Sequence, residues 1–262
     1  LNVNSDLYRL HPDWAMDIPG CAHSEGRNQR ILDLCNPEVS EYIIDSMTKV
    51  FSSANIAYVK WDMNRIFSDY YSKYLKAQGR PQGETAHRYV MALGRIMRTL
   101  TERFPHILFE GCAAGGNRFD LGILCYFPQI WASDNTDAVS RAYIQEGLSY
   151  GYPMSTVSAH VSACPNHQTL RVTPLSTRFN VAAFGICGYE CNLVDMSRAE
   201  RSEIKTQIDI YKKWRHAMQF GSFYRQRTGN IHQWTVVDEE AGRAVGLIMQ
   251  ELVRANTQNE EY

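Results

Sequence analysis

Short apolar runs rich in β-branched and aromatic residues alternate along this chain with longer segments whose apolar residues recur every three or four positions. Runs of the first kind are typical of buried strands, and the second spacing is typical of amphipathic helices. The pattern predicts strands at 56–62, 106–110, 129–133, 154–157 and 186–190. It predicts helices at 37–51, 89–100, 136–149, 177–184 and 197–220.

Two of the predicted helices begin with recognisable cap signals. Asn36 precedes Pro37, which places a good N-cap residue before a proline at the first helical position. Ser197 and Glu200 have the spacing of a capping box. Beyond the last helix the pattern changes, and the tail from 231 to 252 predicts antiparallel strands at 233–237 and 244–248.

Alternation of strands and helices predicts a parallel sheet with helical crossovers. Five strand–helix units occupy roughly the first 220 residues, whereas a closed eight-stranded barrel takes about 250. Two architectures fit: an open doubly wound sheet, or a barrel whose first three strands lie before Leu1. No glycine-rich dinucleotide fingerprint follows any strand, so the main positive signal for the open sheet is missing.

Composition narrows the class of partner. The net charge of the 262 residues is −1, with a sequence pI of about 6.8, so we expect no nucleic-acid partner. No window approaches the ~20 apolar residues of a membrane-spanning helix, so we expect a soluble chain without a membrane partner. Seven cysteines leave at least one thiol free, and their apolar surroundings favour a reducing compartment, which predicts a cytoplasmic protein.

Polar residues collect at the ends of the predicted strands, where barrel enzymes place their active sites. Two aspartates at the ends of non-adjacent strands would face each other across a barrel mouth, and paired carboxylates are typical of glycoside hydrolysis. The residues, in strand order, are Lys60 and Asp62 with Asn64, then Glu110 and Cys112, then Trp131 and Asp134, then His160 after the fourth strand, and Glu190.

Each of these signals also has a purely structural interpretation. Asp134 could be the N-cap of the next helix. Lys60 and Asp62, two residues apart on one strand face, could form an ion pair with each other. The small residues at 113–116 form either a tight turn or a loop that lets a ligand approach the backbone. Arg27 is either a solvated loop arginine or a ligand contact.

Two other motifs are set aside. The segment from Gly147 to Gly151 matches the nucleophile-elbow pattern around Ser149. That motif requires a strand before the serine and a helix after it, whereas here a predicted helix precedes Ser149 and a predicted strand follows it. His160, Cys164 and His167 lack a fourth ligand at zinc-binding spacing, and so do Cys187 and Cys191. We therefore predict neither a metal nor an organic cofactor.

Several separated segments resemble the α-galactosidases of glycoside hydrolase family 36. The resemblance is carried by Tyr58 to Arg65 (YVKWDMNR), by Cys112 to Asp120 (CAAGGNRFD) and by Gln129 to Ala138 (QIWASDNTDA). Further matching segments lie at 5–9 with 11–14, at 26–29, and at 158–162 with 165–168. The resemblance implies a (β/α)8 barrel flanked by an N-terminal β-sandwich and a C-terminal β domain. On this basis residues 1–222 are the last five strand–helix units of the barrel, and 223–262 begin the C-terminal domain.

The resemblance also implies roles for individual residues. Asp62 would be the nucleophile and Asp134 the general acid/base of a double displacement through a covalent galactosyl-enzyme, which requires the carboxyl groups to lie about 5–5.5 Å apart. The expected substrates are raffinose- and melibiose-type α-galactosides, and the expected assembly is a homo-oligomer. The positions expected to line the galactose pocket are Lys60, Arg27, Cys112, Gly115 and Trp131, with Asn64 as their neighbour.

Departures from the family pattern leave alternatives open. The family's loop is usually Cys-Ser-Gly-Gly-Gly, whereas this chain has Cys-Ala-Ala-Gly-Gly at 112–116. The sugar-binding aspartate pair and the tryptophan that the family supplies from its first strands would lie before Leu1. The alternatives are an α-N-acetylgalactosaminidase, a galactosyl transferase of the same type, and a non-catalytic carbohydrate-binding fragment.

Overall fold

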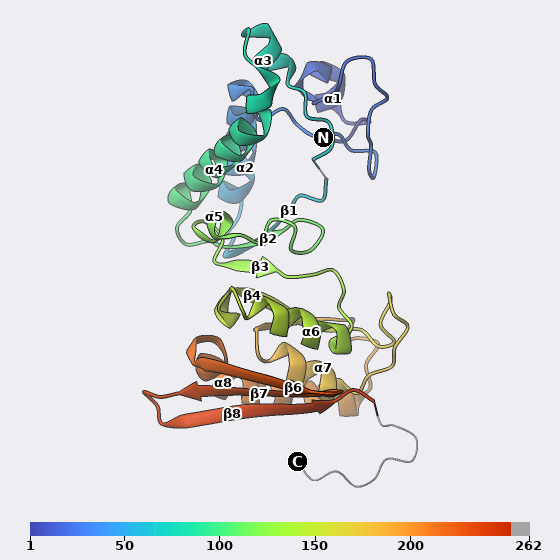
Figure 1. Ribbon diagram of the computed structural model, residues 1–262, viewed down its shortest axis with the longest axis vertical. Helices are drawn as coiled ribbons and strands as arrows, with labels where there is room; N and C mark the ends of the chain where they lie inside the picture. Colours follow the sequence, from blue (N-terminus) through green and yellow to red (C-terminus); the bar gives the residue numbers. More distant parts are fainter. Residues whose placement is uncertain (66, 253–262) are drawn as a thin grey trace. The chain divides into compact units, whose positions relative to one another are not determined.

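The computed structural model describes residues 1–65 and 67–252, and contacts divide the chain into two compact units, Leu1–Pro128 and Gln129–Tyr262. Figure 1 labels the elements of both units. In each unit, parallel strands alternate with helices along the chain, so the predicted α/β class is confirmed. The part of the chain that the structure describes contains no helix long and apolar enough to cross a membrane.

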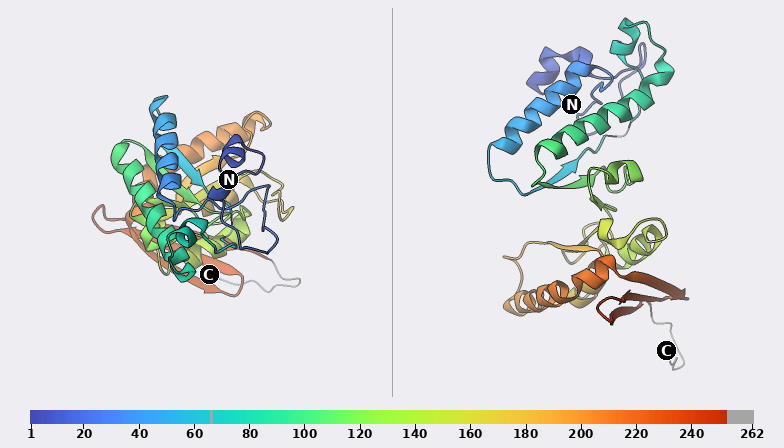
Figure 2. Two further views of the ribbon diagram at one scale, coloured as in Figure 1. Left: turned by 90° about the horizontal axis from the view of Figure 1, so that it is seen from above. Right: turned by 90° about the vertical axis from the view of Figure 1, so that its left-hand side faces the viewer.

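The first unit is built on a pair of parallel strands covered by long helices. Residues 58–62 of one strand pair in register with 108–112 of the other, so Asp62 and Cys112 end side by side. The two long helices lie next to each other, and one of them is the crossover between the strands (Figure 2). The elements are α1 (Asp6–Leu10), α2 (Pro37–Ser52), β1 (Tyr58–Asp62), α3 (Lys73–Ala77), α4 (Thr85–Arg103), β2 (Leu108–Cys112) and α5 (Leu121–Leu124).

Helix α2 follows the sequence prediction closely at its start. The side chain of Asn36 accepts a hydrogen bond from the backbone N–H of Glu38, and Pro37 occupies the first turn. On the buried face, Phe51 packs edge-on against Phe109 of β2, with ring centroids 5.7 Å apart. Val50, which the spacing places on the apolar face, is instead half exposed.

The second unit combines a parallel sheet with an antiparallel one. Its parallel strands are joined by helices, and apolar side chains of the sheet and of the following helix share one core. The long helix at 198–220 begins at the predicted capping box between Ser197 and Glu200. The elements are β3 (Gln129–Trp131), α6 (Ala138–Leu148), β4 (Val157–Ser162), α7 (Leu175–Ala182), β5 (Ile186–Glu190), α8 (Arg198–Phe220), β6 (Ser222–Thr228), β7 (Ile231–Asp238) and β8 (Arg243–Gln250).

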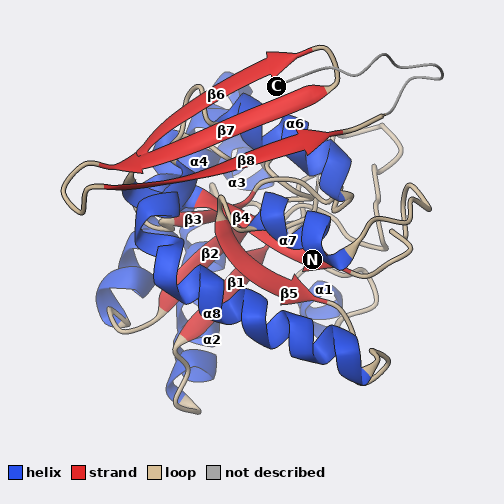
Figure 3. Ribbon diagram, turned by 90° about the horizontal axis from the view of Figure 1, so that it is seen from below, coloured by secondary structure: helices blue, strands red, loops and turns tan. Residues whose placement is uncertain are grey.

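The antiparallel sheet has the strand order β6-β7-β8, and α8 packs against β7 and β8 (Figure 3). Strands β7 and β8 confirm and extend the predictions at 233–237 and 244–248. Strand β6 was not predicted, because Arg225, Gln226 and Arg227 interrupt its apolar pattern. The predicted domain boundary at 222/223 stays a prediction, although β6 begins at Ser222.

The prediction of a fourth strand at 154–157 is wrong. Residues Met154–Thr156 form a 3-10 helix, and the strand runs from Val157 to Ser162. Pro153 starts the tight turn, and both the backbone N–H and the hydroxyl of Thr156 donate to its carbonyl. As a consequence His160 lies inside β4, not after it.

Candidate active site

The carboxylate of Asp62 stands at the carboxyl end of β1 and is exposed. Asn64 Nδ2 donates to Asp62 Oδ2 over 2.7 Å, while Asn64 Oδ1 accepts from the backbone N–H of Ala114 over 2.8 Å. The amide of Asn64 therefore bridges the aspartate and the small-residue loop that follows β2. With both ends of the amide in use, its orientation is fixed.

Cys112 lies directly across from Asp62 in the β1–β2 register, and its thiol is buried. Burial raises the pKa of the Cys112 thiol to about 11, and the hydrogen bond and negative charge of Asp62 push in the same direction. The thiol is therefore protonated at neutral pH, where it can donate to the aspartate but cannot act as a nucleophile.

The loop after Cys112 turns through left-handed backbone. Ala114 has φ 48° and Gly115 has φ 79°, and the N–H of Ala113 donates to the carbonyl of Gly115 over 2.9 Å. Left-handed backbone costs little for glycine but strains an alanine. The departure of this loop from the family pattern therefore falls at a position, Ala114, where glycine would relieve strain.

Lys60 forms an ion pair with a buried glutamate. Its Nζ lies 3.8 Å from Oε1 of Glu110, the residue across from it on β2, and the hydroxyl of Tyr58 donates to Oε2 of the same carboxylate. Lys60 and Asp62 share the end of β1, so the lysine places positive charge on the same strand face as the aspartate. Glu110 was noted in the sequence only as a strand-end residue.

Arg27 lies at the tip of a tight hairpin and is exposed. Gly26 and Gln29 exchange backbone hydrogen bonds, and both Arg27 (φ 56°) and Asn28 (φ 57°) are left-handed, as in a type I′ turn. Nε of Arg65 donates to the carbonyl of Gln29 over 3.0 Å. Arg65 thereby ties the hairpin that carries Arg27 to the segment that follows β1.

In the second unit, Trp131 and Asp134 contact each other at the end of β3. Nε1 of Trp131 donates to Oδ1 of Asp134 over 3.0 Å; the tryptophan is buried, whereas the aspartate is exposed. Asp134 is not the cap of the following helix. That position belongs to Asp137, whose carboxylate accepts from the backbone N–H of Ser140, so the capping interpretation of Asp134 is wrong.

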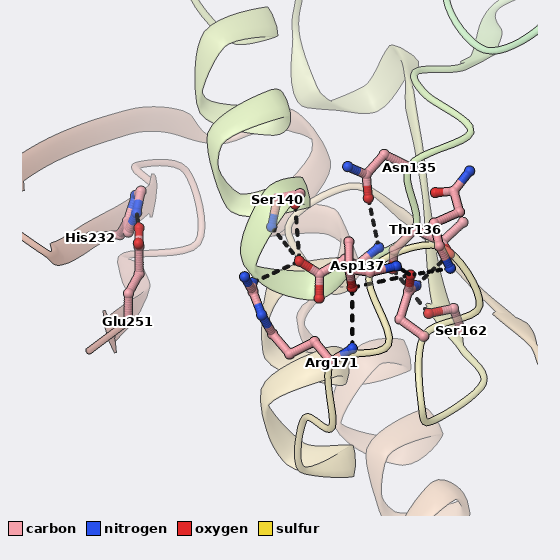
Figure 4. Close-up of polar contacts among 11 residues, drawn as sticks. Asn135, Thr136, Asp137, Ser140, Ser162, Arg171, His232 and Glu251 are labelled. Carbon is pink, nitrogen blue, oxygen red and sulfur yellow. Dashed lines mark hydrogen bonds and ion pairs between the residues drawn. The ribbon is translucent and has the colours of Figure 1, made fainter. Parts of the chain in front are cut away.

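The residues that follow Asp134 in the chain are bound to the end of β4 and to the loop after it (Figure 4). Arg171 Nη1 lies 2.8 Å from Oδ2 of the buried Asp137. Asn166 Nδ2 donates to Oγ1 of Thr136 over 2.9 Å, and Ser162 Oγ donates to the Thr136 carbonyl over 3.0 Å. These contacts hold the segment that carries Asp134.

Two arginines that the sequence placed near the strand ends or in family-like segments, but without a role, build the first unit's strand ends. Arg65 holds the hairpin, and Nη2 of Arg118 donates to the carbonyls of both Met63 and Cys112, at 2.7 and 3.1 Å. Burial lowers the pKa of Arg118. Because these partners are backbone carbonyls, which every residue carries, no pattern of residue types could have identified them.

Within residues 1–65 and 67–252, no cluster of three or more His, Cys, Asp or Glu side chains could hold a metal ion. A cavity of about 310 Å³ in the first unit borders Asp62 and Asn64. Most of its remaining wall is apolar, and Gln29, Arg30 and Arg65 are among its polar members. The apolar lining residues are Leu1, Ile31, Leu32, Leu34, Ile43, Trp61, Met63, Leu93 and Ile96.

Comparison with known proteins identifies relatives along nearly the whole chain. A family model described as Melibiase matches residues 1–221. Alpha-galactosidase AgaA from Geobacillus stearothermophilus is 48% identical over 98% of this chain and 35% of its own length. Alpha-galactosidase 1 from Pediococcus pentosaceus is 47% identical over 95% of this chain and 34% of its own length. The chain thus spans about a third of the length of these curated relatives.

A solved structure gives the same result for the fold. The crystal structure of a variant of the GH36 α-galactosidase AgaA from Geobacillus stearothermophilus, in complex with raffinose, matches with a TM-score of 0.94 at 46% identity. The match covers 98% of this chain and 36% of that chain. It confirms the predicted fold class, an incomplete (β/α)8 barrel followed by the start of a C-terminal antiparallel β domain.

Proposed function

The chain belongs to the melibiase family, and on that premise we propose that it carries the catalytic carboxylates of a retaining α-galactosidase. The observation that carries the proposal is the setting of Asp62, a carboxylate at a strand end that faces the amide of Asn64 and the protonated thiol of Cys112. These two neighbours orient the carboxylate, and an oriented oxygen at a strand end is what attack on a bound sugar requires.

The proposed reaction is a double displacement. Asp62 attacks the anomeric carbon while Asp134 protonates the departing oxygen, which leaves a covalent galactosyl-enzyme. Asp134 then removes a proton from water, and the water displaces Asp62, so that the anomeric configuration is retained. The residues proposed to contact the sugar are Lys60, Arg27, Asn64, Cys112, Gly115 and Trp131.

We further propose raffinose- and melibiose-type α-galactosides as substrates. The raffinose bound to the Geobacillus α-galactosidase variant supports this choice. The ion pair of Lys60 with Glu110 is consistent with a sugar substrate, since an anchored ammonium group can donate a hydrogen bond to a sugar hydroxyl.

The test is hydrolysis of p-nitrophenyl α-D-galactoside by the complete gene product, beside Asp62→Ala and Asp134→Ala. We expect Asp62→Ala to be inactive and azide to restore turnover of an activated substrate with formation of β-galactosyl azide. Asp45→Asn is the matched control, because Asp45 is an exposed aspartate on helix α2. Activity of Asp62→Ala equal to that of its parent would overturn the proposal.

A further inference from the structure

A continuous row of side chains leads from the end of β5 to Asp134. Oε2 of Glu190 lies 2.9 Å from Nδ1 of His160, and the imidazole of His160 stacks on the indole of Trp131 with ring centroids 4.2 Å apart and an interplanar angle of 26°. Trp131 in turn donates to Asp134. The strands β3, β4 and β5 each supply one member of this row.

The absence of a side chain at Gly188 leaves room for the imidazole of His160. Gly188 pairs with His160 in the β4–β5 register, and a Cβ at Gly188 would lie 3.1 Å from Cδ2 of His160. A larger residue at this position would therefore crowd the imidazole and disturb its position.

The indole is also held by a buried cation. The guanidinium carbon of Arg141 lies 4.8 Å from the Trp131 ring centroid, and Arg141 donates to the carbonyls of Ser133 and Ser158. Burial lowers the pKa of Arg141 to about 10. Trp131 is thus held by two polar side chains whose own positions are fixed by hydrogen bonds.

The direction of the Trp131 hydrogen bond has a chemical consequence. An indole N–H can only donate, so Oδ1 of Asp134 must accept. In the carboxylic acid the carbonyl oxygen is the better acceptor, so this hydrogen bond favours the proton on Oδ2. The tryptophan therefore selects which oxygen of Asp134 can protonate a departing group.

We propose that His160 and Glu190 are positioning residues for proton transfer by Asp134, acting through Trp131. An apolar ring would fill the same space, but the contact between Nδ1 and Glu190 also fixes the rotation of the imidazole. The inference rests on the proposed function, since it assigns a role in the acid step of that reaction.

The experiment compares leaving groups in the complete gene product. Fluoride departs from α-galactosyl fluoride with little help from an acid, whereas the glucose of melibiose needs a proton. Because general acid catalysis contributes roughly 10²–10⁴-fold, we expect His160→Ala to lower kcat/KM for melibiose by about 10-fold or more. kcat/KM for the fluoride reports only the steps up to formation of the galactosyl-enzyme, so it should stay within about 3-fold of the wild type.

Glu190→Gln should produce the same selectivity with a smaller loss. Glu190 is largely exposed, with 58% of its side chain accessible, so this variant keeps the test informative if His160→Ala does not fold. His216→Ala is the matched control. His216 lies on α8, and its Nδ1 is 3.4 Å from the carboxylate of Asp238 on β7, so the variant also removes a histidine that contacts a carboxylate. We expect it to leave both substrates unaffected.

The outcomes separate the two proposals. Equal losses on both substrates in His160→Ala and Glu190→Gln would show that the pair only supports packing, and would overturn the positioning role while the galactosidase activity stands. A wild type that cleaves neither substrate would instead overturn the proposed function, and the positioning role with it.

Discussion

Three neighbouring side chains define the surroundings of the exposed Asp62 carboxylate. Asn64 donates to one of its oxygens, Cys112 lies across from it in the strand register, and Lys60 comes from the same strand. The sequence identified all three residues, because strand-end positions in a parallel sheet can be predicted from spacing. It could not identify Arg118, whose guanidinium joins the two strand ends through backbone carbonyls.

The Cys112 thiol gives the first prediction. Burial raises its pKa to about 11 from a usual value of 9.0, so the folded state favours the neutral thiol. The stability contributed by this group is fully present below about pH 9 and is lost as the pH rises through about 11.

Iodoacetamide labelling followed by peptide mass spectrometry tests whether the Cys112 thiol is buried and neutral in the folded protein. At pH 8 the exposed Cys125 should be modified while Cys112 stays unmodified until the protein is unfolded. Rapid labelling of Cys112 in the folded protein would contradict the protonated, buried thiol.

At the scale of elements, hydrogen-bonded helix starts were easier to predict than strands. Asn36 and Ser197 cap their helices as expected, because a cap is a local interaction between residues a few positions apart. The strand at 154–157 was misplaced because the local turn after Pro153 overrides the β propensity of the residues that follow. Strand β6 was missed because its arginines lie over the rings of Tyr143 and Tyr150, contacts that only the tertiary structure reveals.

The loop after β2 supplies the second prediction. Ala114→Gly should raise the free energy of unfolding by about 1 kcal/mol, because it removes the strain of a left-handed alanine. Urea denaturation measures the difference. Ala113→Gly is the matched control in the same loop and should destabilise the protein, since Ala113 has no left-handed backbone to relieve. Equal effects of the two substitutions would contradict the strain at Ala114.

On the scale of the whole molecule, the structure describes two compact units, and a buried histidine fastens the C-terminal sheet within the second. Oε2 of Glu146 on α6 lies 3.0 Å from Nδ1 of His232 on β7. Oε1 of Glu251 faces Nε2 of the same imidazole (Figure 4). Trp234 also donates to Glu146. This cluster could not be predicted from the sequence, since its members lie up to 105 positions apart. The homo-oligomer and the cytoplasmic location stay predictions.

This cluster makes the third prediction, on acid stability. Burial alone would raise the pKa of Glu146, but hydrogen bonds from His232 and Trp234 outweigh it and hold the pKa below the usual 4.5. A depressed carboxylate pKa stabilises the fold above about pH 4.5, and this stabilisation is lost as the pH falls through the folded-state pKa. Thermal unfolding of Glu146→Gln should therefore depend less on pH below about 4.5 than that of the wild type. Parallel pH profiles would contradict the role of Glu146.

The most direct test of the central claim is covalent capture of the nucleophile. The complete gene product would be treated with 5-fluoro-α-D-galactosyl fluoride, whose ring fluorine destabilises the cationic transition state and slows release of the galactosyl-enzyme. Peptide mass spectrometry should then find one fluorogalactosyl group, attached to Asp62, and none in Asp62→Ala. A label on another residue, or turnover of the wild type without any covalent adduct, would contradict the assignment of Asp62.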